Sequence, residues 1–381
     1  MRPLRLLTLA SLTALITAGC GTHRPLHKGG VDPSTGLYTR EDEDLVIFDT
    51  LPLVLRRTYL AGDHVSRQFG VGGTHPGEWY LIGDGTTYQW AELILATGGR
   101  IHFDRISPGT SGVDPVFEHR STPTDFFGAR LKRDPSGWAI NFEDGRVAVF
   151  KQCPPATHEV CSILEMRDGQ GHRIRYMRDP SGLLLTMQGD TRSIAFEYDD
   201  SRRVVRARDS LGRFVNYRYD QRGRLSTVTT SEGIVRSYTY NTRDEMLTID
   251  EPGWHIENRY DAAGRVARQV TRYPDSEDAD AIGFDYVSGD GGVSQTAIRE
   301  YDGTLTRQTY NRHHYLLTQT FDAEGPHPVS VLYTRGEATN LTSAVSISCD
   351  GRDGPVDVTV PVLSSAEDAS IKLAIARTCG E

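Results

Sequence analysis

Hydrophobic and polar residues alternate along short segments in the middle of the chain. Residues 214–219 place Val215, Tyr217 and Tyr219 on one side of an extended chain and two polar residues on the other. The same order occurs in the segment that ends at Tyr198. Because successive side chains of a β-strand point to opposite faces, the pattern predicts strands with one packed face and one solvated face.

Turn-forming residues recur between these segments about every ten positions. Ten markers from Asp168 to Asp261 span 93 residues in nine intervals, and the resulting period of about 10.3 fits one strand and one tight turn. Six turns carry Asp at the first position and Gly at the fourth, as type I turns prefer. These turns begin at Asp134, Asp179, Asp209, Asp220, Asp261 and Asp322. We therefore predict an all-β protein, an antiparallel β-meander that forms a curved or partly closed strip.

The pattern changes after Thr334. Residues 343–349 and 356–362 are predicted strands, and residues 364–379 are a predicted helix with a capping box at its start. We expect this short α/β segment to cap the open end of the array, since terminal repeats generally need a cap.

The N terminus has the pattern of an export signal. Arg2 and Arg5 precede an apolar run that is too short to cross a bilayer as a stable helix. The run ends in small residues before Cys20 and resembles the lipobox of bacterial lipoproteins, although Thr17 stands where Leu is usual. The resemblance implies acylation of Cys20 and a stable membrane anchor. Gly21 follows in place of Asp, which favours the outer membrane. An ordinary signal peptide with an incidental cysteine is the alternative.

The remaining cysteines fit an oxidising compartment. With Cys20 lipidated, an even set of four remains, namely Cys153, Cys161, Cys349 and Cys379. Two local bridges, Cys153 with Cys161 and Cys349 with Cys379, are the simplest pairing, and loop entropy gives them roughly 2.5 and roughly 3.5–4 kcal/mol. Cys153, His158 and Cys161 could instead bind a metal, but no second ligand pair has zinc-site spacing.

Composition and motifs exclude more functions than they suggest. Lys and Arg number 42 against 51 Asp and Glu, so the net charge of −9 gives no reason to expect binding to nucleic acid. The sequence has no Gly-rich phosphate loop between a strand and a helix, and no serine nucleophile elbow. We expect no cofactor, no metal and no enzymatic activity.

The repeated turns carry a family resemblance. Residues 217–225 resemble closely the Tyr-Asp (YD) repeat of rearrangement-hotspot (RHS) proteins, and residues 260–266 do so too. Copies at Tyr198, Tyr219, Tyr240 and Tyr260 are 21, 21 and 20 residues apart. The residues that carry the motif are Tyr198, Asp199, Tyr219, Asp220, Gly223, Tyr240, Tyr260, Asp261 and Gly264.

The segment before these repeats also resembles the family. Residues 31–36, 51–59 and 66–70 are similar to the segment that leads into RHS repeats, although Gly73 stands where that segment usually has Trp. The resulting division is a signal peptide (1–19), a tether (20–30), an RHS-type N-terminal β segment (31–129), a YD-repeat region (130–334) and a disulfide-stapled cap (335–381).

The resemblance raises the question of self-cleavage. Large family members wind into a hollow shell around a toxin that is released at an Asp-Pro-x-Gly-Leu sequence, and Asp179 to Leu183 matches this sequence. Asp179 would then be a catalytic carboxylate. A type I turn explains the same residues. From Arg130 to Gly325 the period allows about nineteen strands, which close a ring only about 30 Å across. We expect side chains of the strands to fill such a ring and to leave no room for a toxin.

These inferences lead to one main functional expectation. We expect a non-enzymatic lipoprotein anchored in the outer membrane, on its periplasmic face or at the cell surface, that binds an envelope glycan or a protein partner. The alternative is a carrier or accessory of a contact-dependent toxin system, with self-cleavage between Asp179 and Leu183. An exported hydrolase is a third hypothesis.

Overall fold

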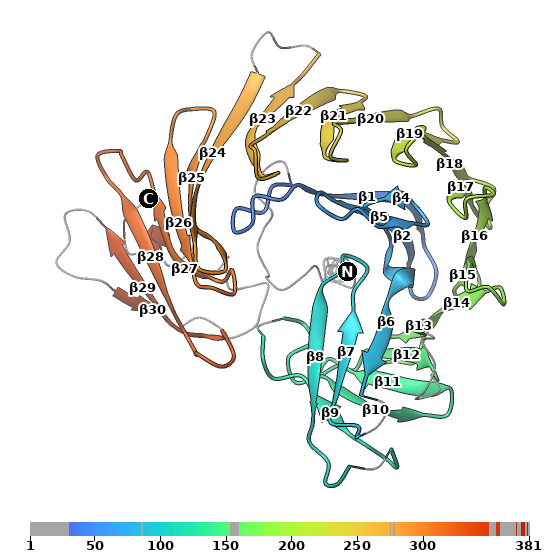
Figure 1. Cartoon of the computed structure of the whole chain (residues 1–381). Coiled ribbons are helices and arrows are strands. Elements are labelled where there is room, and N and C mark those ends of the chain that lie inside the picture. Colours follow the sequence, from blue (N-terminus) through green and yellow to red (C-terminus); the bar gives the residue numbers. More distant parts are fainter. Residues whose placement is uncertain are drawn as a thin grey trace, which may run out of the picture.

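The computed structural model describes residues 30–349, except 85–86, 111, 123, 153–159, 275 and 277–278, together with 356–358, 371, 375–377 and 379. Within these residues the chain forms strands β1 to β30 and the short 3₁₀ helix η2. The predicted all-β fold with a curved antiparallel meander is confirmed (Figure 1).

Residues 31–78, which we name the plug, form a small sheet and the 3₁₀ turn. The elements are β1 (Thr39–Ile47), β2 (Leu53–Leu60), β3 (Ser66–Arg67), β4 (Gly70–Val71), β5 (Gly73–Thr74) and η2 (Pro76–Glu78). β2 pairs antiparallel with β1 and with β5, and β3 pairs with β4. β2 is buried on both faces, which is unusual for a strand of so small a sheet and indicates that other parts of the chain cover it.

The eight strands that follow close into a barrel. They are β6 (Tyr80–Gly83), β7 (Trp90–Ile94), β8 (Arg100–Arg105), β9 (Phe117–Glu118), β10 (Arg130–Asp134), β11 (Gly137–Asn141), β12 (Val147–Lys151) and β13 (Cys161–Arg167). Each pairs antiparallel with the next, and β6 pairs with β13 to close the ring. Eight strands leave just enough interior for side chains, and buried Phe103 and Phe150 lie in the core. The ladder of hydrogen-bonded strands is continuous through β9, β10 and β11. The sheet therefore has no break at residue 130, where we expected the repeats to begin.

From β13 the sheet continues as an open strip of antiparallel strands. The strip consists of β14 (Arg173–Arg178), β15 (Leu184–Gln188), β16 (Ser193–Tyr198), β17 (Val204–Asp209), β18 (Phe214–Tyr219), β19 (Leu225–Thr230), β20 (Val235–Tyr240), β21 (Met246–Glu251), β22 (Trp254–Tyr260), β23 (Val266–Arg272), β24 (Ala279–Gly289), β25 (Gly292–Arg299), β26 (Leu305–Tyr310), β27 (Leu316–Phe321), β28 (Val329–Arg335), β29 (Thr342–Cys349) and β30 (Val356–Val358). In the described residues, the stretch from Arg130 to Gly325 holds eighteen strands, close to the nineteen expected from the period.

The strip curves around the plug, so one expectation needs correction. Figure 1 shows β1, β2 and β5 inside the curve formed by β14 to β23, and residues of β1 and β2 contact β18 and β16. We expected the strands' own side chains to fill the interior. The plug fills it instead, because its apolar strands bury the inward faces of the repeats.

The curvature has a local cause at one edge of the strip. Each of the eight hairpins from β14–β15 to β28–β29 that turn at this edge contains a β-bulge, whereas the seven described pairings between these hairpins contain none. We name this edge the bulged rim and the opposite edge the plain rim. A bulge bends its strand and increases the local twist, so bulges confined to one rim curl the strip in one direction.

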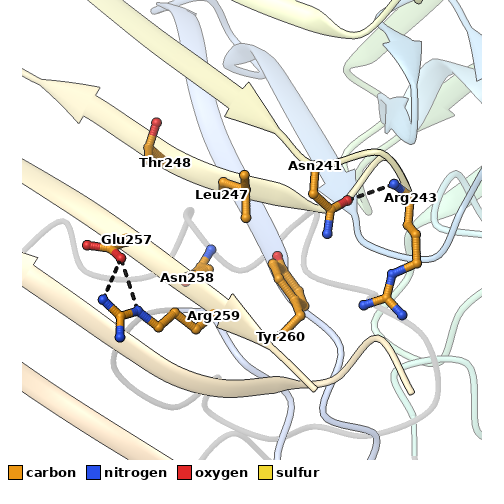
Figure 2. A pocket seen from close by; sticks show the side chains of 8 residues that line it. All are labelled: Asn241, Arg243, Leu247, Thr248, Glu257, Asn258, Arg259 and Tyr260. Carbon is orange, nitrogen blue, oxygen red and sulfur yellow. Dashed lines mark hydrogen bonds and ion pairs between the residues drawn. The ribbon is translucent and has the colours of Figure 1, made fainter. Parts of the chain in front are cut away.

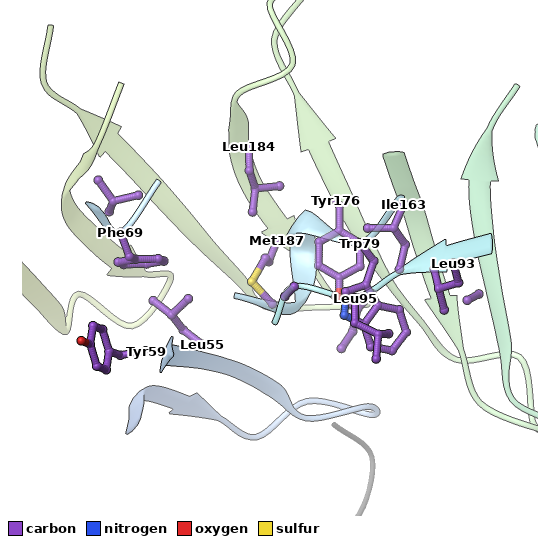
Figure 3. Close-up of a cluster of buried hydrophobic side chains, with 14 of the residues drawn as sticks. Leu55, Tyr59, Phe69, Trp79, Leu93, Leu95, Ile163, Tyr176, Leu184 and Met187 are labelled. Atoms are coloured by element: carbon purple, nitrogen blue, oxygen red, sulfur yellow. The ribbon is translucent and has the colours of Figure 1, made fainter. Parts of the chain in front are cut away.

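One continuous core joins the plug, the barrel and the strip (Figure 3). Phe69 of the plug packs edge to face on Tyr217 of β18, with ring centroids 5.1 Å apart. Trp79, just after η2, packs on Phe126 at 5.9 Å. Because this core is shared, the three parts stabilise one another.

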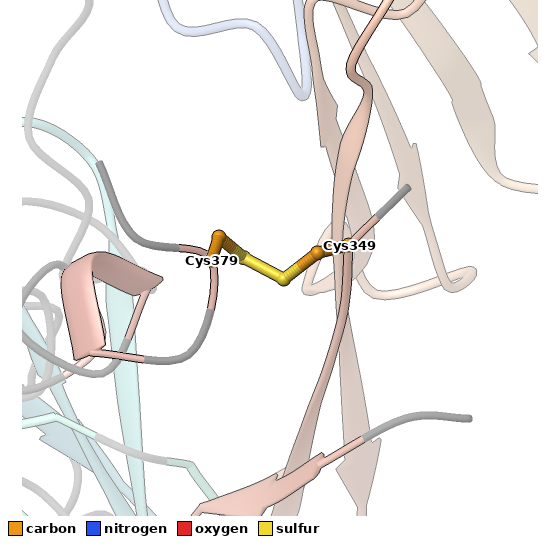
Figure 4. Close-up of a disulfide and its surroundings, with 2 residues drawn as sticks. All are labelled: Cys349 and Cys379. Atoms are coloured by element: carbon orange, nitrogen blue, oxygen red, sulfur yellow. A yellow bond between two sulfur atoms is a disulfide. The ribbon is translucent and has the colours of Figure 1, made fainter. Parts of the chain in front are cut away.

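A second, smaller core lies under the C-terminal segment. Ile371 is buried there against β28 and β29, and Cys379 bonds to Cys349 at the end of β29, as predicted (Figure 4). Residues 371, 375–377 and 379 are helical, in agreement with the expected helix, whereas its proposed cap at Ser364 and Glu367 and the end of the strand expected at 356–362 lie outside the described residues. In the described part of the chain, no helix has the length and apolar character needed to cross a membrane.

Candidate functional site

The turns of the predicted repeats share one hydrogen-bond pattern. At Asp220, Oδ1 accepts hydrogen bonds from the amides of Arg222 (2.9 Å) and Arg224 (3.0 Å), and Oδ2 accepts one from Arg224 Nε (2.7 Å). Asp199 and Asp261 make the same contacts in their own turns. Partial burial opposes ionisation, but the turn amides and the arginine outweigh it and lower the pKa of Asp220. The carboxylate therefore stabilises the turn.

The repeat tyrosines connect each hairpin with the hairpin before it. Every hydroxyl donates to the carbonyl oxygen of the first residue of the preceding bulged strand. The pairs are Tyr198 to Leu184 (2.5 Å), Tyr219 to Val204 (2.7 Å), Tyr240 to Leu225 (2.7 Å), Tyr260 to Met246 (2.8 Å) and Tyr286 to Val266 (2.7 Å). Desolvation by burial raises the pKa of each of these tyrosines, so each hydroxyl stays protonated and donates. The motif Tyr thus joins successive repeats.

The arginine that ends each regular turn covers the tyrosine of the next repeat. The guanidinium carbon lies 4.7 Å from the ring centre for Arg203 over Tyr219, 5.1 Å for Arg224 over Tyr240 and 4.8 Å for Arg265 over Tyr286. A cation over an aromatic face contributes about 0.5–2 kcal/mol, depending on its desolvation. Aspartate, arginine and tyrosine of the repeat therefore act as one structural unit.

The plug binds backbone groups at the bulges. The amide of Val204 donates to the carbonyl oxygen of Gln68 (2.7 Å), and the amide of Val266 donates to that of Gly36 (2.9 Å). The amide of Met246 donates to the hydroxyl of Tyr59 (3.1 Å). Because buried amides need partners, the plug supplies acceptors for these inward-facing donors of the strip.

Two plug glycines allow this close approach. Gly36 and Gly70 have φ values of +76° and +84°. A Cβ at Gly36 would lie 2.5 Å from the Cβ of Arg265, and a Cβ at Gly70 would lie 2.5 Å from the carbonyl oxygen of Gly223. Both glycines belong to the segments that resemble the leader of RHS repeats, and their role is to dock the plug on the bulged rim.

A buried ion cluster joins the plug to the inner face of the strip. Arg57 is 1% exposed and donates from Nε to Asp44 (3.0 Å) and from Nη2 to Asp42 (3.0 Å). The hydroxyl of Tyr217 donates to Asp44 at 3.0 Å, and Arg57 also donates to the hydroxyl of Tyr238 at 3.2 Å. Burial opposes ionisation of Asp42, but Arg57 and Arg40 outweigh it and lower its pKa.

The candidate cleavage motif forms a turn on the bulged rim. Oδ1 of Asp179 accepts hydrogen bonds from the hydroxyl of Ser181 (2.8 Å) and the amide of Leu183 (2.9 Å), and the amide of Asp179 donates to the carbonyl oxygen of Leu183 (2.9 Å). The Ser181 hydrogen bond and the turn amides lower the pKa of Asp179. Within the described residues no hydrogen bond joins this carboxyl to a second carboxyl, and its contacts are those of a turn.

The predicted cysteine sites have different outcomes. Cys349 and Cys379 form a disulfide with Cα atoms 5.7 Å apart. Cys161 lies in β13, is buried and is disulfide-bonded, but its expected partner Cys153 lies outside the described residues, as does the lipidation residue Cys20.

A shallow depression of about 410 Å³ lies at the irregular repeat (Figure 2). Here Asn241 and Glu245 replace the Asp and Arg of the regular turn, so no arginine covers Tyr260 in the described structure. The depression is lined by Asn241, Arg243, Leu247, Thr248, Glu257, Asn258, Arg259 and Tyr260. Glu257 binds Arg259 at 3.0 Å, and Arg243 binds Glu245 at 3.0 Å. Because these charged side chains pair with one another, we assign them a structural role in the irregular repeat.

The described residues contain no group of three or more His, Cys, Asp or Glu side chains arranged to hold a metal ion. The functional contacts that the sequence did not reveal are those of the plug, above all Arg57 with Asp42 and Asp44. One signal was available, since Arg56 and Arg57 interrupt an otherwise apolar strand. A charge inside such a strand indicates a buried partner.

The curved meander and its linked turns define a YD-repeat shell, and comparisons with known families agree. Residues 156–277 match the family described as teneurin YD-shell, and residues 28–103 match a domain of unknown function, DUF6531. The predicted resemblance to RHS/YD-repeat proteins is confirmed for the repeat region. No curated protein matches it.

Several solved structures are similar to parts of the chain. A crystal structure of TcdB2-TccC3-TEV is 14% identical over 70% of this chain and 15% of that chain, with a TM-score of 0.40. The Tc holotoxin pore of Photorhabdus luminescens with a TccC3 mutation is 11% identical over 82% and 19%, with a TM-score of 0.40. TcdB2-TccC3 without its hypervariable C-terminal region is 11% identical over 82% and 21%, with a TM-score of 0.38. The present chain thus spans about a fifth or less of each of these chains.

Proposed function

We propose that this RHS/YD-repeat protein is a non-enzymatic binding and structural module, anchored by an acylated Cys20 in the outer membrane, that contacts an envelope glycan or a protein partner. The observation that carries the proposal is the filling of the shell by the plug. Its inner face is occupied by Arg57, Tyr59 and Phe69, so the outer face and the rims are the surfaces left for contacts.

The polar groups of the repeats support a structural role. The carboxylates of Asp199, Asp220 and Asp261 bind their own turns, and the motif tyrosines bind neighbouring carbonyl groups. A catalytic acid or base needs a reacting group within hydrogen-bond reach, whereas these carboxylates and hydroxyls form hydrogen bonds with the protein's own turns and carbonyl groups. A carrier of a folded toxin would need an empty interior, which the plug occupies, so the carrier alternative receives no support from this geometry.

The experiment is the intact mass of the protein from its own membrane fraction, with and without reduction. We expect one species that begins at Cys20, is heavier than its peptide by acyl chains, and gains four hydrogens on reduction. A Cys20→Ser variant should leave the membrane fraction while keeping its fold by circular dichroism. An unmodified chain in the membrane fraction would contradict the anchor.

The same measurement tests the alternative. Fragments that end near Leu183, absent in an Asp179→Asn variant, would make Asp179 a catalytic residue and would replace the binding-module proposal with self-cleavage. Asp199→Asn is the matched control, because it removes a turn carboxylate outside the motif.

A further inference from the structure

Large apolar side chains are exposed along the plain rim, at the turns that join its hairpins. Leu211 lies in the turn between β17 and β18 and is 55% exposed, and Ile234 lies directly before β20 and is 42% exposed. Phe48, in the plug loop between β1 and β2, is 83% exposed. The regular turns of the bulged rim instead carry polar or small residues at 200–202, 221–223 and 262–264. The two rims therefore present different surfaces.

The loop that carries Phe48 is bound to the plain rim by its neighbour Asp49. The carboxylate of Asp49 accepts hydrogen bonds from the amides of Thr191 (2.9 Å) and Arg192 (2.8 Å), and from the hydroxyl of Thr191 (2.9 Å). Thr191 and Arg192 belong to the turn that joins β15 to β16 on this rim. Burial of a phenylalanine side chain is favourable, yet this loop holds Phe48 in the solvent. Its position indicates contact with an apolar partner.

The turns of this rim are also bound to the plug and to one another. Arg213, just after the turn that contains Leu211, donates from Nη2 to the carbonyl oxygen of Val46 in β1 (2.8 Å). The amide of Ser231, in the next turn along the rim, donates to the carbonyl oxygen of Phe214 in β18 (2.8 Å). The backbone that carries the exposed apolar side chains is therefore held in place before binding, so its contact with a partner costs little ordering entropy.

We propose that the plain rim lies on the surface of a lipid bilayer, with the side chains of Phe48, Leu211 and Ile234 inserted among the lipids. The inference rests on the proposed acylation of Cys20, which would keep the protein at a membrane. The described chain begins at Gly30, and the ten residues from Cys20 up to it can span at most about 35 Å. A strand of six residues, as in most of the strip, is about 20 Å long. The tether is therefore long enough for either rim to reach the bilayer.

The distribution of the apolar side chains favours a bilayer over a protein partner. Each hairpin adds two strands, so successive turns of the rim are about 10 Å apart and follow the curve of the strip around the plug (Figure 1). A protein interface gathers its apolar residues in one buried core, whereas a bilayer accepts separate side chains anywhere along its plane. Tyr273 and Tyr301, 44% and 60% exposed, follow on later turns of the same rim, and tyrosine is enriched at membrane surfaces.

The first test measures contact between the rim and lipids in the acylated protein. The protein is reconstituted in vesicles of phosphatidylethanolamine and phosphatidylcholine, with and without brominated acyl chains. The variants Phe48→Trp and Leu211→Trp should each add fluorescence that brominated lipids quench. The control variants Val65→Trp and Leu332→Trp, at positions 54% and 49% exposed away from this rim, should add fluorescence that stays unquenched. Absence of quenching at the rim, or equal quenching at the control positions, would overturn the inference and leave the anchor intact.

The second test does not depend on acyl chains. The chain that begins at residue 20, with Cys20→Ser, is sedimented with the same vesicles without bromine. We expect it to sediment with them at low and at high salt alike, because the contact is apolar. Adding Phe48→Ser/Leu211→Ser should weaken this binding about tenfold or more. Adding Val65→Ser/Leu332→Ser instead should leave the binding unchanged.

The outcomes of the second test separate the rim contact from the anchor. Vesicle binding by a protein that mass spectrometry shows to carry no acyl chains in its own membrane fraction would support the rim contact and refute the anchor. Three results would overturn the rim contact. These are no sedimentation with the vesicles, an equal loss in the control variant, and a lipid-free dimer that the rim variant abolishes, which would make a second copy of the chain the partner.

Discussion

The hydroxyl of Tyr219 donates a 2.7 Å hydrogen bond to the carbonyl oxygen of Val204, across the boundary between two hairpins. Val204 is fully buried and sits beside the bulge of its own hairpin, where its amide donates to the plug. Val204 therefore binds the next repeat through its carbonyl oxygen and the plug through its amide. The first prediction of stability depends on this arrangement.

Replacing Tyr219 with Phe removes the donor and leaves the Val204 carbonyl group buried without that partner. An unsatisfied buried polar group costs about 1–3 kcal/mol, so we expect the free energy of unfolding to fall by this amount in urea denaturation. Tyr301→Phe is the control, because Tyr301 is 60% exposed and should change stability by less than about 0.5 kcal/mol. Equal losses in both variants would show that the hydroxyl bond is not the cause.

Replacing Arg57 with Met removes the central cation of the buried cluster. Asp42 and Asp44 then stay buried without it, and breaking such a pair costs about 3–5 kcal/mol. We expect a large fall in the urea midpoint, whereas Arg208→Met on the outer face should change it little. A wild-type midpoint in the Arg57 variant would contradict the proposed docking of the plug.

Alkaline pH should unfold the protein through its buried tyrosines. Desolvation by burial raises the pKa of Tyr38 and of Tyr176 to about 12, whereas a tyrosine of the unfolded chain ionises near 10. Their stabilising contribution is complete below pH 10 and is lost as the pH rises from 10 towards 12, at roughly 1.4 kcal/mol per pH unit and tyrosine. Phenolate absorbance should therefore rise together with loss of circular dichroism. Full ionisation near pH 10 in a folded protein would contradict this.

The Cys349–Cys379 disulfide closes a loop of 30 residues, for which loop entropy gives about 3–4 kcal/mol. We expect the double variant Cys349→Ser/Cys379→Ser to lose the C-terminal helix to limited proteolysis, because without the disulfide only the small core around Ile371 holds this helix. The barrel and plug should remain resistant. Simultaneous digestion of the whole chain would show that the cap stabilises the entire shell.

The repeats could be predicted from the sequence because their contacts are local. Asp220 binds residues two and four positions ahead, and such spacing appears directly in the amino-acid order. The position of the plug could not be predicted from the sequence, because contacts such as Gln68 with Val204 join distant segments through backbone atoms. Any residue type can make such backbone contacts, so the sequence does not reveal them. Arg56 and Arg57 within an apolar strand were a sign of a buried partner, but the partners of these arginines and of the plug glycines Gly36 and Gly70 became visible only in the folded chain.

The same distinction applies to the candidate site. The residues from Asp179 to Leu183 match a cleavage motif, yet the same residue types also favour a type I turn. The observed hydrogen bonds are those of a turn.

The contacts of the plug also fix how many hairpins the strip can hold between them. Gln68, Tyr59 and Gly36 of the plug contact the strip at Val204, Met246 and Val266. Duplicating a hairpin within this stretch would preserve every tyrosine bond between neighbours but would displace at least one of these three contacts. The plug also contacts the strip beyond Val266, where the hydroxyl of Thr296 donates to the carbonyl oxygen of Pro33 (2.6 Å) and Nδ1 of His314 lies 3.0 Å from the carbonyl oxygen of Ser34. Gain or loss of hairpins is therefore best tolerated beyond His314, towards the C terminus, where no such contact with the plug is described.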